Sequence, residues 1–352
     1  MSATAGTVSL IAGAGDVTET VGGSTTGVPA GIDRDGQRHG WVVLLTNVAN
    51  QVTTLGAFPV LNAFEFADGL AVTVNDVISA GTTLLLESPG ITVTATGSLS
   101  GTPVILRADA FDLVGGVSST GLVAIDRLTT GTLALGGAGD SFGGAGLAAI
   151  TAGTLALGSL DGLSAAAETA ELDLNSDTDF TSITQTLGLF ATGAIVEPGG
   201  ISVVHLFGNA GSAALTGTNQ IAMLDGFATS AGDFALSDAA SLTISQVVTA
   251  TGSVTIAVTG GANTLTVPVD ITGTNVSLSA DGGLAQTAGT VQATTGDVSL
   301  SSADSTVSFA GTVTALGTVD AGGVRRHRRN RHPERRRADR QRRRQRGPDR
   351  HQ

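Results

Sequence analysis

Short segments that resemble one another recur along the chain, and this repetition limits its possible folds more than any other feature. NQVTTLGAF (50–58) and NQIAMLDGF (219–227) align without a gap, and past a one-residue insertion the match continues through residues 64–81 and 234–252. The copies are offset by 169 before the insertion and by 170 after it. Chains that repeat themselves in this way build stacked structures, in which each repeat contacts only its neighbours.

The repeat places the same residue type at three pairs of positions: Asn50 and Asn219, Phe58 and Phe227, and Asp68 and Asp238. We expect these positions to serve structure, through turn or stacking hydrogen bonds that close each coil. They divide the chain into two related units, at about 42–120 and 211–290. A shorter echo, GTLALG, begins at position 131 and again at position 153, and this offset suits one coil of a solenoid.

Strand-forming segments dominate the sequence. They are short, rich in Val, Ile, Leu and Thr, and separated by Gly, Asn, Asp and Ser. We expect strands in ten segments: 7–12, 42–47, 70–76, 83–88, 91–96, 103–108, 241–248, 253–258, 264–271 and 276–280. Residues 163–174 contain helix formers interrupted by Ser and Thr, and they are predicted to be loop or strand.

These patterns predict an all-β fold in which residues 1–323 form a right-handed parallel β-helix, or solenoid. One coil of short strands cannot bury its apolar face, whereas stacked coils form a continuous thin core. A thin core explains why only 3% of the residues are aromatic. Other all-β folds are the alternative, but a globular sandwich would use more aromatic residues and less repetition.

Charge divides the chain into two unlike parts. Residues 1–323 carry 4 arginines against 27 acidic residues, and residues 324–352 carry 14 arginines against 3 acidic residues, which gives −23 and +11 and the overall charge of −12. We predict that this C-terminal tail is disordered. Its residue types are those that GC-rich codons for small and aliphatic residues give when read out of frame, which favours out-of-frame translation. An inert tail and a nucleic-acid-binding arm are the alternatives.

Composition excludes several classes of function. The chain has no cysteine, so it has neither disulfides nor thiolate chemistry. The acidic body repels phosphate and is not expected to bind nucleic acid. No apolar run is long enough to span a membrane. The N-terminus has no basic segment before its apolar stretch, so we expect any export signal to lie outside this chain. Residues 31–41 share the arginine and histidine of the tail and are also candidates for a shifted frame.

Three segments carry residue types used in catalysis or metal binding. GGAGDSFGGAG (136–146) is similar to a glycine-rich calcium repeat, but its spacing differs, and a flexible turn between coils is expected. His205 stands alone among apolar residues and is expected to be partly buried and hydrogen-bonded, without a metal.

The third segment is a mixed-charge group that comprises Arg107, Asp109, Asp112, Asp126 and Arg127. Arg107 and Asp109 would share a face of one strand, which predicts a surface ion pair. The alternative is the active site of a carbohydrate-active β-helix enzyme, which needs converging carboxylates. We assign no catalytic residue, no metal ligand and no cofactor, and we expect that the chain is not an enzyme.

The pattern N-Q-[IV]-x-x-L-x-x-F followed by F-x-x-x-D resembles the repeats of filamentous haemagglutinin-like and autotransporter-like bacterial β-helix exoproteins. The resemblance covers most of residues 40–320. It implies an adhesin-like stalk, secreted or held at the cell surface, of which this chain is an internal fragment. It also implies partners such as host or matrix glycans or proteins, bound on shallow surfaces.

Uncapped ends of such a fragment would favour self-association. Three other functions stay open: a carbohydrate-active enzyme, nucleic-acid binding through the tail, and a degraded gene fragment without independent function.

Overall fold

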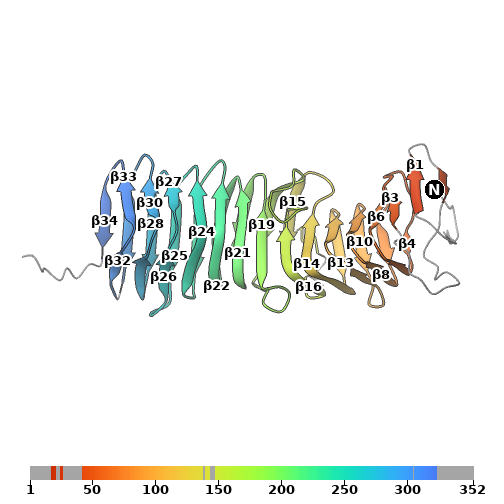
Figure 1. Cartoon of the computed structure of the whole chain (residues 1–352), viewed down its shortest axis with the longest axis horizontal. Coiled ribbons are helices and arrows are strands. Elements are labelled where there is room, and N and C mark those ends of the chain that lie inside the picture. The colour runs from red at the N-terminus through yellow and green to blue at the C-terminus, as the bar shows by residue number, and fades with distance from the viewer. Residues whose placement is uncertain are drawn as a thin grey trace, which may run out of the picture.

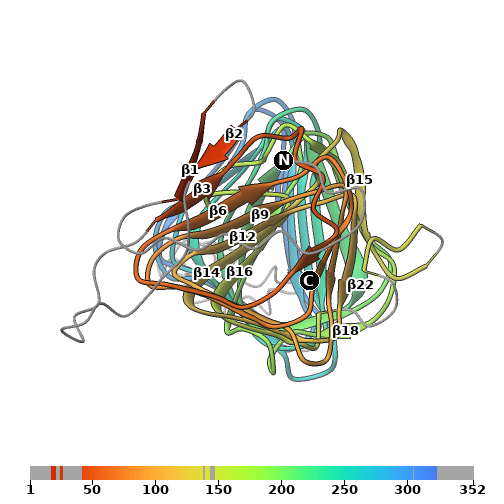
Figure 2. The same ribbon diagram turned by 90° about the vertical axis from the view of Figure 1, so that its right-hand side faces the viewer.

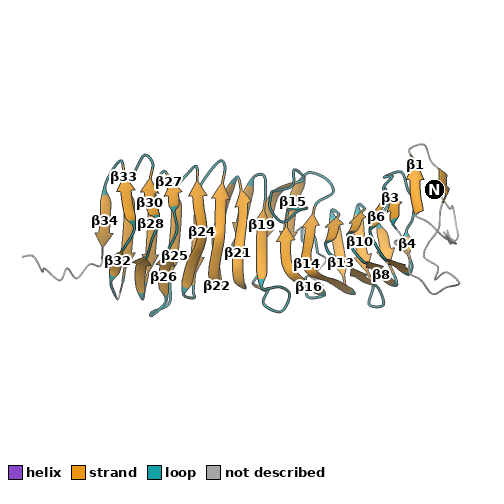
Figure 3. Ribbon diagram, viewed as in Figure 1, coloured by secondary structure: helices purple, strands orange, loops and turns teal. Residues whose placement is uncertain are grey.

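The computed structural model describes residues 17–20, 24–26, 42–137, 139–142, 147–303 and 305–322. The segments 7–12, 31–41 and 324–352, which carry expectations from the sequence, lie outside the described residues. Every regular element within the described ranges is a β-strand (Figure 3). Their stacking forms the expected parallel β-solenoid, with its coils arranged along the long axis of the molecule (Figure 1).

Each coil of the solenoid passes through three faces, which we number in chain order. A view from the N-terminal end shows the coils superposed around a narrow interior (Figure 2). Strands on one face pair with the strands of the preceding and following coils, so apolar residues of successive coils lie in register. The interior is therefore lined by columns of mostly aliphatic side chains.

The strands of the three faces are as follows. Face 1 contains β3 (Val43–Leu45), β6 (Phe64–Ala67), β9 (Leu84–Glu87), β12 (Val104–Arg107), β19 (Thr186–Phe190), β27 (Ile271–Gly273), β30 (Thr290–Ala293) and β33 (Thr312–Ala315). Face 2 contains β4 (Thr54–Leu55), β7 (Val72–Val74), β10 (Gly90–Val93), β13 (Ala110–Leu113), β15 (Gly131–Leu135), β17 (Thr169–Leu174), β20 (Ala194–Glu197), β23 (Phe234–Asp238), β25 (Val254–Val258), β28 (Val276–Ala280), β31 (Val298–Ser302) and β34 (Val319–Gly322). Face 3 contains β5 (Phe58–Val60), β8 (Val77–Ala80), β11 (Ser98–Ser100), β18 (Thr178–Asp179), β26 (Thr264–Val267), β29 (Gly283–Gln286) and β32 (Val307–Phe309).

Five long strands bend around a corner and contribute to more than one face: β14 (Gly116–Asp126), β16 (Ile150–Leu157), β21 (Ile201–Ala210), β22 (Ser212–Thr229) and β24 (Leu242–Ala250). At the N-terminal side, β1 (Val17–Thr20) pairs in parallel with β3 and antiparallel with β2 (Ser24–Thr26). Nine of the ten expected strand segments overlap an observed strand, and the tenth, 7–12, is not described. Residues 163–174 are loop and then β17, as expected.

One column on face 1 runs without interruption through the described coils. Its thirteen positions are Leu45, Phe66, Leu86, Leu106, Ile125, Leu157, Leu189, Gly208, Phe227, Val248, Ile271, Val291 and Val313. Gly208 is the exception in size, because a Cβ there would lie 2.1 Å from Leu189 O and 2.8 Å from the ring of Phe227. The column shows how short aliphatic strands bury a continuous core without a large sandwich interior.

Most neighbouring positions in this column are separated by similar lengths of chain, whereas the steps from Ile125 to Leu157 and from Leu157 to Leu189 are longer. The usual coil length agrees with the offset between the two GTLALG copies. The two copies nevertheless do not pair with each other in neighbouring coils. The first copy lies on face 2 in β15, which pairs with β17, and the second lies in β16, which pairs with β19. Insertions in the two long coils separate the copies.

On face 2 the pairing of strands is interrupted, because β13 pairs with β10 and β15 pairs with β17 but β13 and β15 do not pair with each other. Residues 139–142 lie between these two strands. The Phe111 N–H donates to the Ser141 carbonyl oxygen at 2.6 Å, and the Ser141 N–H donates to Ala134 O at 2.9 Å. The rings of Phe111 and Phe142 stack at 5.1 Å, and Phe142 is buried. The described part of the calcium-like segment thus fills the core between two sheets, so the expectation of a mere turn was incomplete.

Candidate functional site

Asn50 and Asp68 turn the chain from face 1 to face 2 in successive coils. Asn50 Nδ2 donates to Ala67 O at 3.1 Å, and the Gly69 N–H donates to Asn50 O at 3.1 Å. The Val52 N–H donates to the Asp68 carboxylate at 2.7 Å. Both side chains are buried. They therefore satisfy backbone groups that the corner removes from the strand ladder.

Asn219 and Asp238 make the same bonds at a different corner, between face 2 and face 3. Asn219 Nδ2 donates to Ser237 O at 3.0 Å, and the Ala239 N–H donates to Asn219 O at 2.7 Å. The Ile221 N–H donates to Asp238 Oδ1 at 3.0 Å. The motif is therefore rotated by one face between its two copies, although its hydrogen bonds are preserved.

The phenylalanines of the repeat are rotated in the same way. Phe58 lies on face 3 and contacts Phe64 at 5.5 Å between ring centroids. Phe227 lies on face 1 and contacts Phe234 at 4.8 Å. The repeat thus describes a corner with its adjoining strands, and the offset between its two copies is not a whole number of coils. The division into units at about 42–120 and 211–290 stays a prediction.

A third acidic residue, Glu197, joins the Asn219 corner from the preceding coil. Its Oε2 accepts hydrogen bonds from Asn219 Nδ2 at 3.0 Å and from the Gly217 N–H at 3.2 Å. Glu197 and Asp238 are each 0% exposed, and Glu197 Oε1 and Asp238 Oδ2 have no hydrogen-bond partner. Burial raises the pKa of Glu197 to about 7 and that of Asp238 to about 6, against the lowering effect of their hydrogen bonds.

The mixed-charge group forms a ladder across coils rather than along one strand. Arg107 is in register with Glu87 and Asp126, and it contacts Glu87 at 3.0 Å, Glu168 at 3.5 Å and Asp126 at 3.8 Å. Burial raises the pKa of Asp126, whereas a 2.6 Å hydrogen bond from Thr169 and the charge of Arg107 lower it.

The expected pair of Arg107 and Asp109 is wrong. Asp109 instead contacts Arg127 at 3.0 Å. Registered residues on neighbouring coils lie about 4.8 Å apart, whereas alternate residues of one strand lie about 6.6 Å apart, so pairing across coils is shorter. Asp112 is exposed on β13, in register with Thr92.

His205 takes part in a polar row on the outer surface of β21, β22 and β24. Its Nδ1 lies 2.7 Å from Asp225 Oδ2, and Asp225 Oδ1 accepts a hydrogen bond from Ser245. The His205 side chain is 32% exposed, as expected for a partly buried, hydrogen-bonded histidine. In a nucleophilic triad the histidine contacts the serine, whereas here Asp225 separates them.

Asp225 and Ser245 were not predicted from the sequence, although a signal for them exists. His205 and Asp225 are separated by 20 in the sequence, and so are Asp225 and Ser245, which corresponds to one coil at each step. Within the described ranges, no three His, Asp or Glu side chains are grouped so that they could hold a metal ion.

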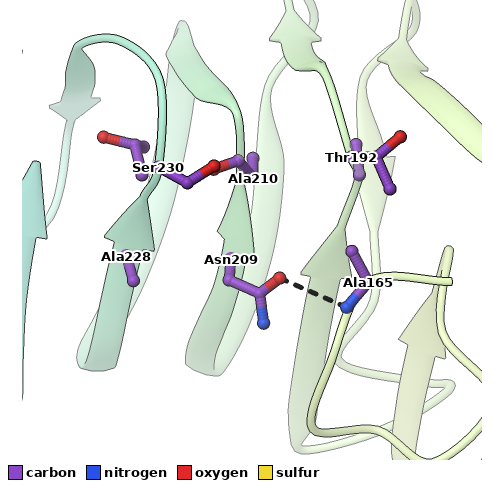
Figure 4. Close-up of a pocket in the computed structure, with 8 residues that line it drawn as sticks. Ala165, Thr192, Asn209, Ala210, Ala228 and Ser230 are labelled. Atoms are coloured by element: carbon purple, nitrogen blue, oxygen red, sulfur yellow. Dashed lines mark hydrogen bonds between the residues drawn. The ribbon is translucent and has the colours of Figure 1, made fainter. Parts of the chain in front are cut away.

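A groove of about 440 Å³ lies where the loop of residues 158–168 overhangs face 1 (Figure 4). It is lined by Ala165, Ala191, Thr192, Asn209, Ala210, Ala228, Thr229 and Ser230. Asn209 ties the loop down, because its Oδ1 accepts from the Ala165 N–H at 3.2 Å and its Nδ2 donates to Leu163 O at 3.1 Å. The Leu163 side chain is 77% exposed at the tip of this loop.

A second groove, of about 590 Å³, lies between face 3 and face 1 of the earlier coils. Its lining is Ala80, Ser100, Gly101, Thr102, Ser118, Ser119, Thr120, Thr151, Ala152 and Gly153. Both grooves are shallow and present hydroxyl, amide and methyl groups. Such surfaces offer hydrogen bonds to a ligand spread along the shaft.

Comparison of the chain with family models, with curated proteins and with solved structures finds no match. Among the described residues there is no helix of the length and apolarity needed to cross a membrane.

Proposed function

We propose that this chain is a segment of the shaft of a bacterial adhesin-like exoprotein, secreted or held at the cell surface, with a structural and adhesive role and no catalysis. The observation that carries the proposal is the unbroken thirteen-position column on face 1. At about 4.8 Å per coil, thirteen coils give a rod of roughly 60 Å. The similarity of the repeats to filamentous haemagglutinin-like and autotransporter-like exoproteins supports the same role.

Adhesion would use the lateral grooves rather than a deep pocket. The two described arginines of the shaft, Arg107 and Arg127, are both paired with acidic residues, and most other charges there are acidic. A neutral or basic partner, such as a neutral host or matrix glycan or a protein, is therefore the partner that this surface favours.

Self-association through the ends of the shaft belongs to the same proposal, and light scattering of the full chain at increasing concentration measures it.

Binding of the purified full chain to arrays of glycans and matrix proteins tests the adhesive role. We expect retention on at least one neutral glycan or protein, and Ala228→Trp, which fills the groove beside Asn209, should reduce it at least tenfold. Ala235→Trp, on the outer surface of face 2, is the matched control and should bind as the unchanged chain does. Release of sugar fragments from a polysaccharide would contradict the proposal and favour the enzyme. Retention on DNA alone, lost at high salt, would favour the tail as a nucleic-acid arm.

Surface location needs a separate measurement. Antibodies raised against the shaft should label intact cells of the producing bacterium. Labelling only after the cells are opened would contradict an exported stalk.

A further inference from the structure

Glu197, Asn219 and Asp238 form a buried corner with two acidic groups and no basic one. Asn219 lies between the acids, since its Nδ2 contacts Glu197 at 3.0 Å and the Ile221 N–H two positions further on contacts Asp238 at 3.0 Å. Both carboxyl groups are 0% exposed, and each has one oxygen without a hydrogen-bond partner. Proteins avoid an unpaired ionised carboxylate in such a place by neutralising the group.

The strands packed around this corner, β17 and β20 to β25, supply no counter-charge to it. Besides the two acids of the corner, the titratable residues on these strands are Glu171, Asp173, His205 and Asp225. His205 contacts Asp225 on the outer surface and does not contact the corner. None of these strands carries an arginine, and Asp177, which follows β17, adds a further negative charge. The charge of Asp177 therefore disfavours ionisation of Glu197, and burial without a counter-charge disfavours that of Asp238.

We propose that this corner is a proton-operated lock in the middle of the shaft. With Glu197 and Asp238 protonated, the coils from β20 to β23 are closed around Asn219. Loss of the protons creates buried charge that only water can solvate, so the corner opens and these coils loosen. Burial raises the pKa of both carboxyl groups, in agreement with this geometry.

The Asn50 corner is an internal control for the lock. It has the same Asn and Asp, but Asp68 uses both oxygens, one for the Val52 N–H and one for the Leu70 N–H. Because burial raises the pKa of Asp68 as well, the comparison shows whether the unpartnered oxygens of Glu197 and Asp238 add to the general effect of pH.

Hydrogen exchange of the full chain tests the proposal through peptides that contain Gly217 and Ile221, whose N–H groups bond to the two carboxyls. After correction for intrinsic exchange, we expect their protection to fall roughly 100-fold between about pH 5 and about pH 8. Peptides that contain Val52 and Leu70 should change less, because both oxygens of Asp68 accept backbone N–H groups and neither is left unpartnered. Equal changes at both corners, or constant protection at Gly217, would overturn the lock.

The double substitution Glu197→Gln and Asp238→Asn removes both titrating groups while keeping the shapes of the side chains. Its protection at Ile221 should no longer depend on pH, and an unaltered dependence would overturn the proposal. If this variant does not fold, infrared spectroscopy of the unchanged chain replaces it. A carbonyl band of protonated carboxylic acid should persist at about pH 6, and its absence would count against the lock.

Discussion

Two buried corners of the shaft hold carboxyl groups in opposite ways. At the first, Asp126 lies under Arg107, which also contacts Glu87 and Glu168, so a permanent cation offsets part of the cost of burying the acid. At the second, Glu197 and Asp238 flank Asn219, and no cation of the surrounding strands approaches. A chain with four arginines in residues 1–323 has few cations to bury. The same fold can therefore compensate the charge of a buried carboxyl group with an arginine or avoid that charge by keeping the group protonated.

The largest expected effect is at the arginine corner. Arg107→Leu would leave Asp126 buried without its counter-ion, which should lower the free energy of unfolding by about 3–5 kcal/mol. Chemical denaturation measures the change. Arg127→Ala is the control, because it removes the pair with the partly exposed Asp109 and two hydrogen bonds to the carbonyl oxygens of Thr129 and Thr132 but leaves no buried acid unpaired; it should cost less, about 1–2 kcal/mol. Similar costs for the two variants would show that Arg107 does not compensate a buried charge.

A slightly smaller effect is expected from pH at the Glu197 corner. The folded pKa of Glu197, about 7, lies above its ordinary value of 4.5, so the folded chain binds more protons between these values. Stability is therefore greatest at the acid end and falls as pH rises through this window, by about 3 kcal/mol. Thermal unfolding at a series of pH values measures it, and Glu197→Gln should give a shallower dependence. Stability that rises from about pH 5 to about pH 8 would contradict the comparison.

A third effect is expected at the asparagine corners. Asn219 Nδ2 reaches three oxygens, those of Glu197, Leu215 and Ser237, and its Oδ1 accepts from the Ile201 N–H. Asn219→Ala should therefore cost about 2–3 kcal/mol of unfolding free energy. Asn50→Ala should also destabilise the chain, because its Nδ2 donates to Leu45 O and Ala67 O. A cost below about 1 kcal/mol for Asn219→Ala would show that the acids do not depend on Asn219.

The smallest effect is expected on the outer surface. His205 and Asp225 are 32% and 28% exposed, and exposed pairs contribute little. His205→Ala should change the unfolding free energy by at most about 1 kcal/mol. A larger loss, in the same denaturation assay, would show that the polar row holds β21, β22 and β24 in place.

The fold could be predicted because strand alternation and repeats are local signals. Matching positions predict a structural role for Asn50, Asp68 and their counterparts, and all four side chains lie at corners where they bond to backbone groups. Pairing across coils could not be predicted, because it requires the length of every coil, and insertions lengthen the two coils that end at Leu157 and Leu189. For this reason the partners of Arg107 and the row from His205 to Ser245 were missed.

Burial of single acids was also beyond the sequence. Glu197 precedes a Pro-Gly-Gly turn, where a charged residue is normally solvated. Its side chain is buried because Gly217 leaves room beside it, since a Cβ on Gly217 would collide with Glu197 Oε1. That contact joins neighbouring coils, and no pattern within either segment indicates it.

The most direct measurement is an NMR titration of the carboxyl carbon of Glu197 in the full chain, with Glu197→Gln used to assign the signal. We expect a midpoint at about 7, as burial without a cation requires. A midpoint at or below the ordinary value of 4.5 would contradict the contrast between a corner balanced by arginine and a corner balanced by protons.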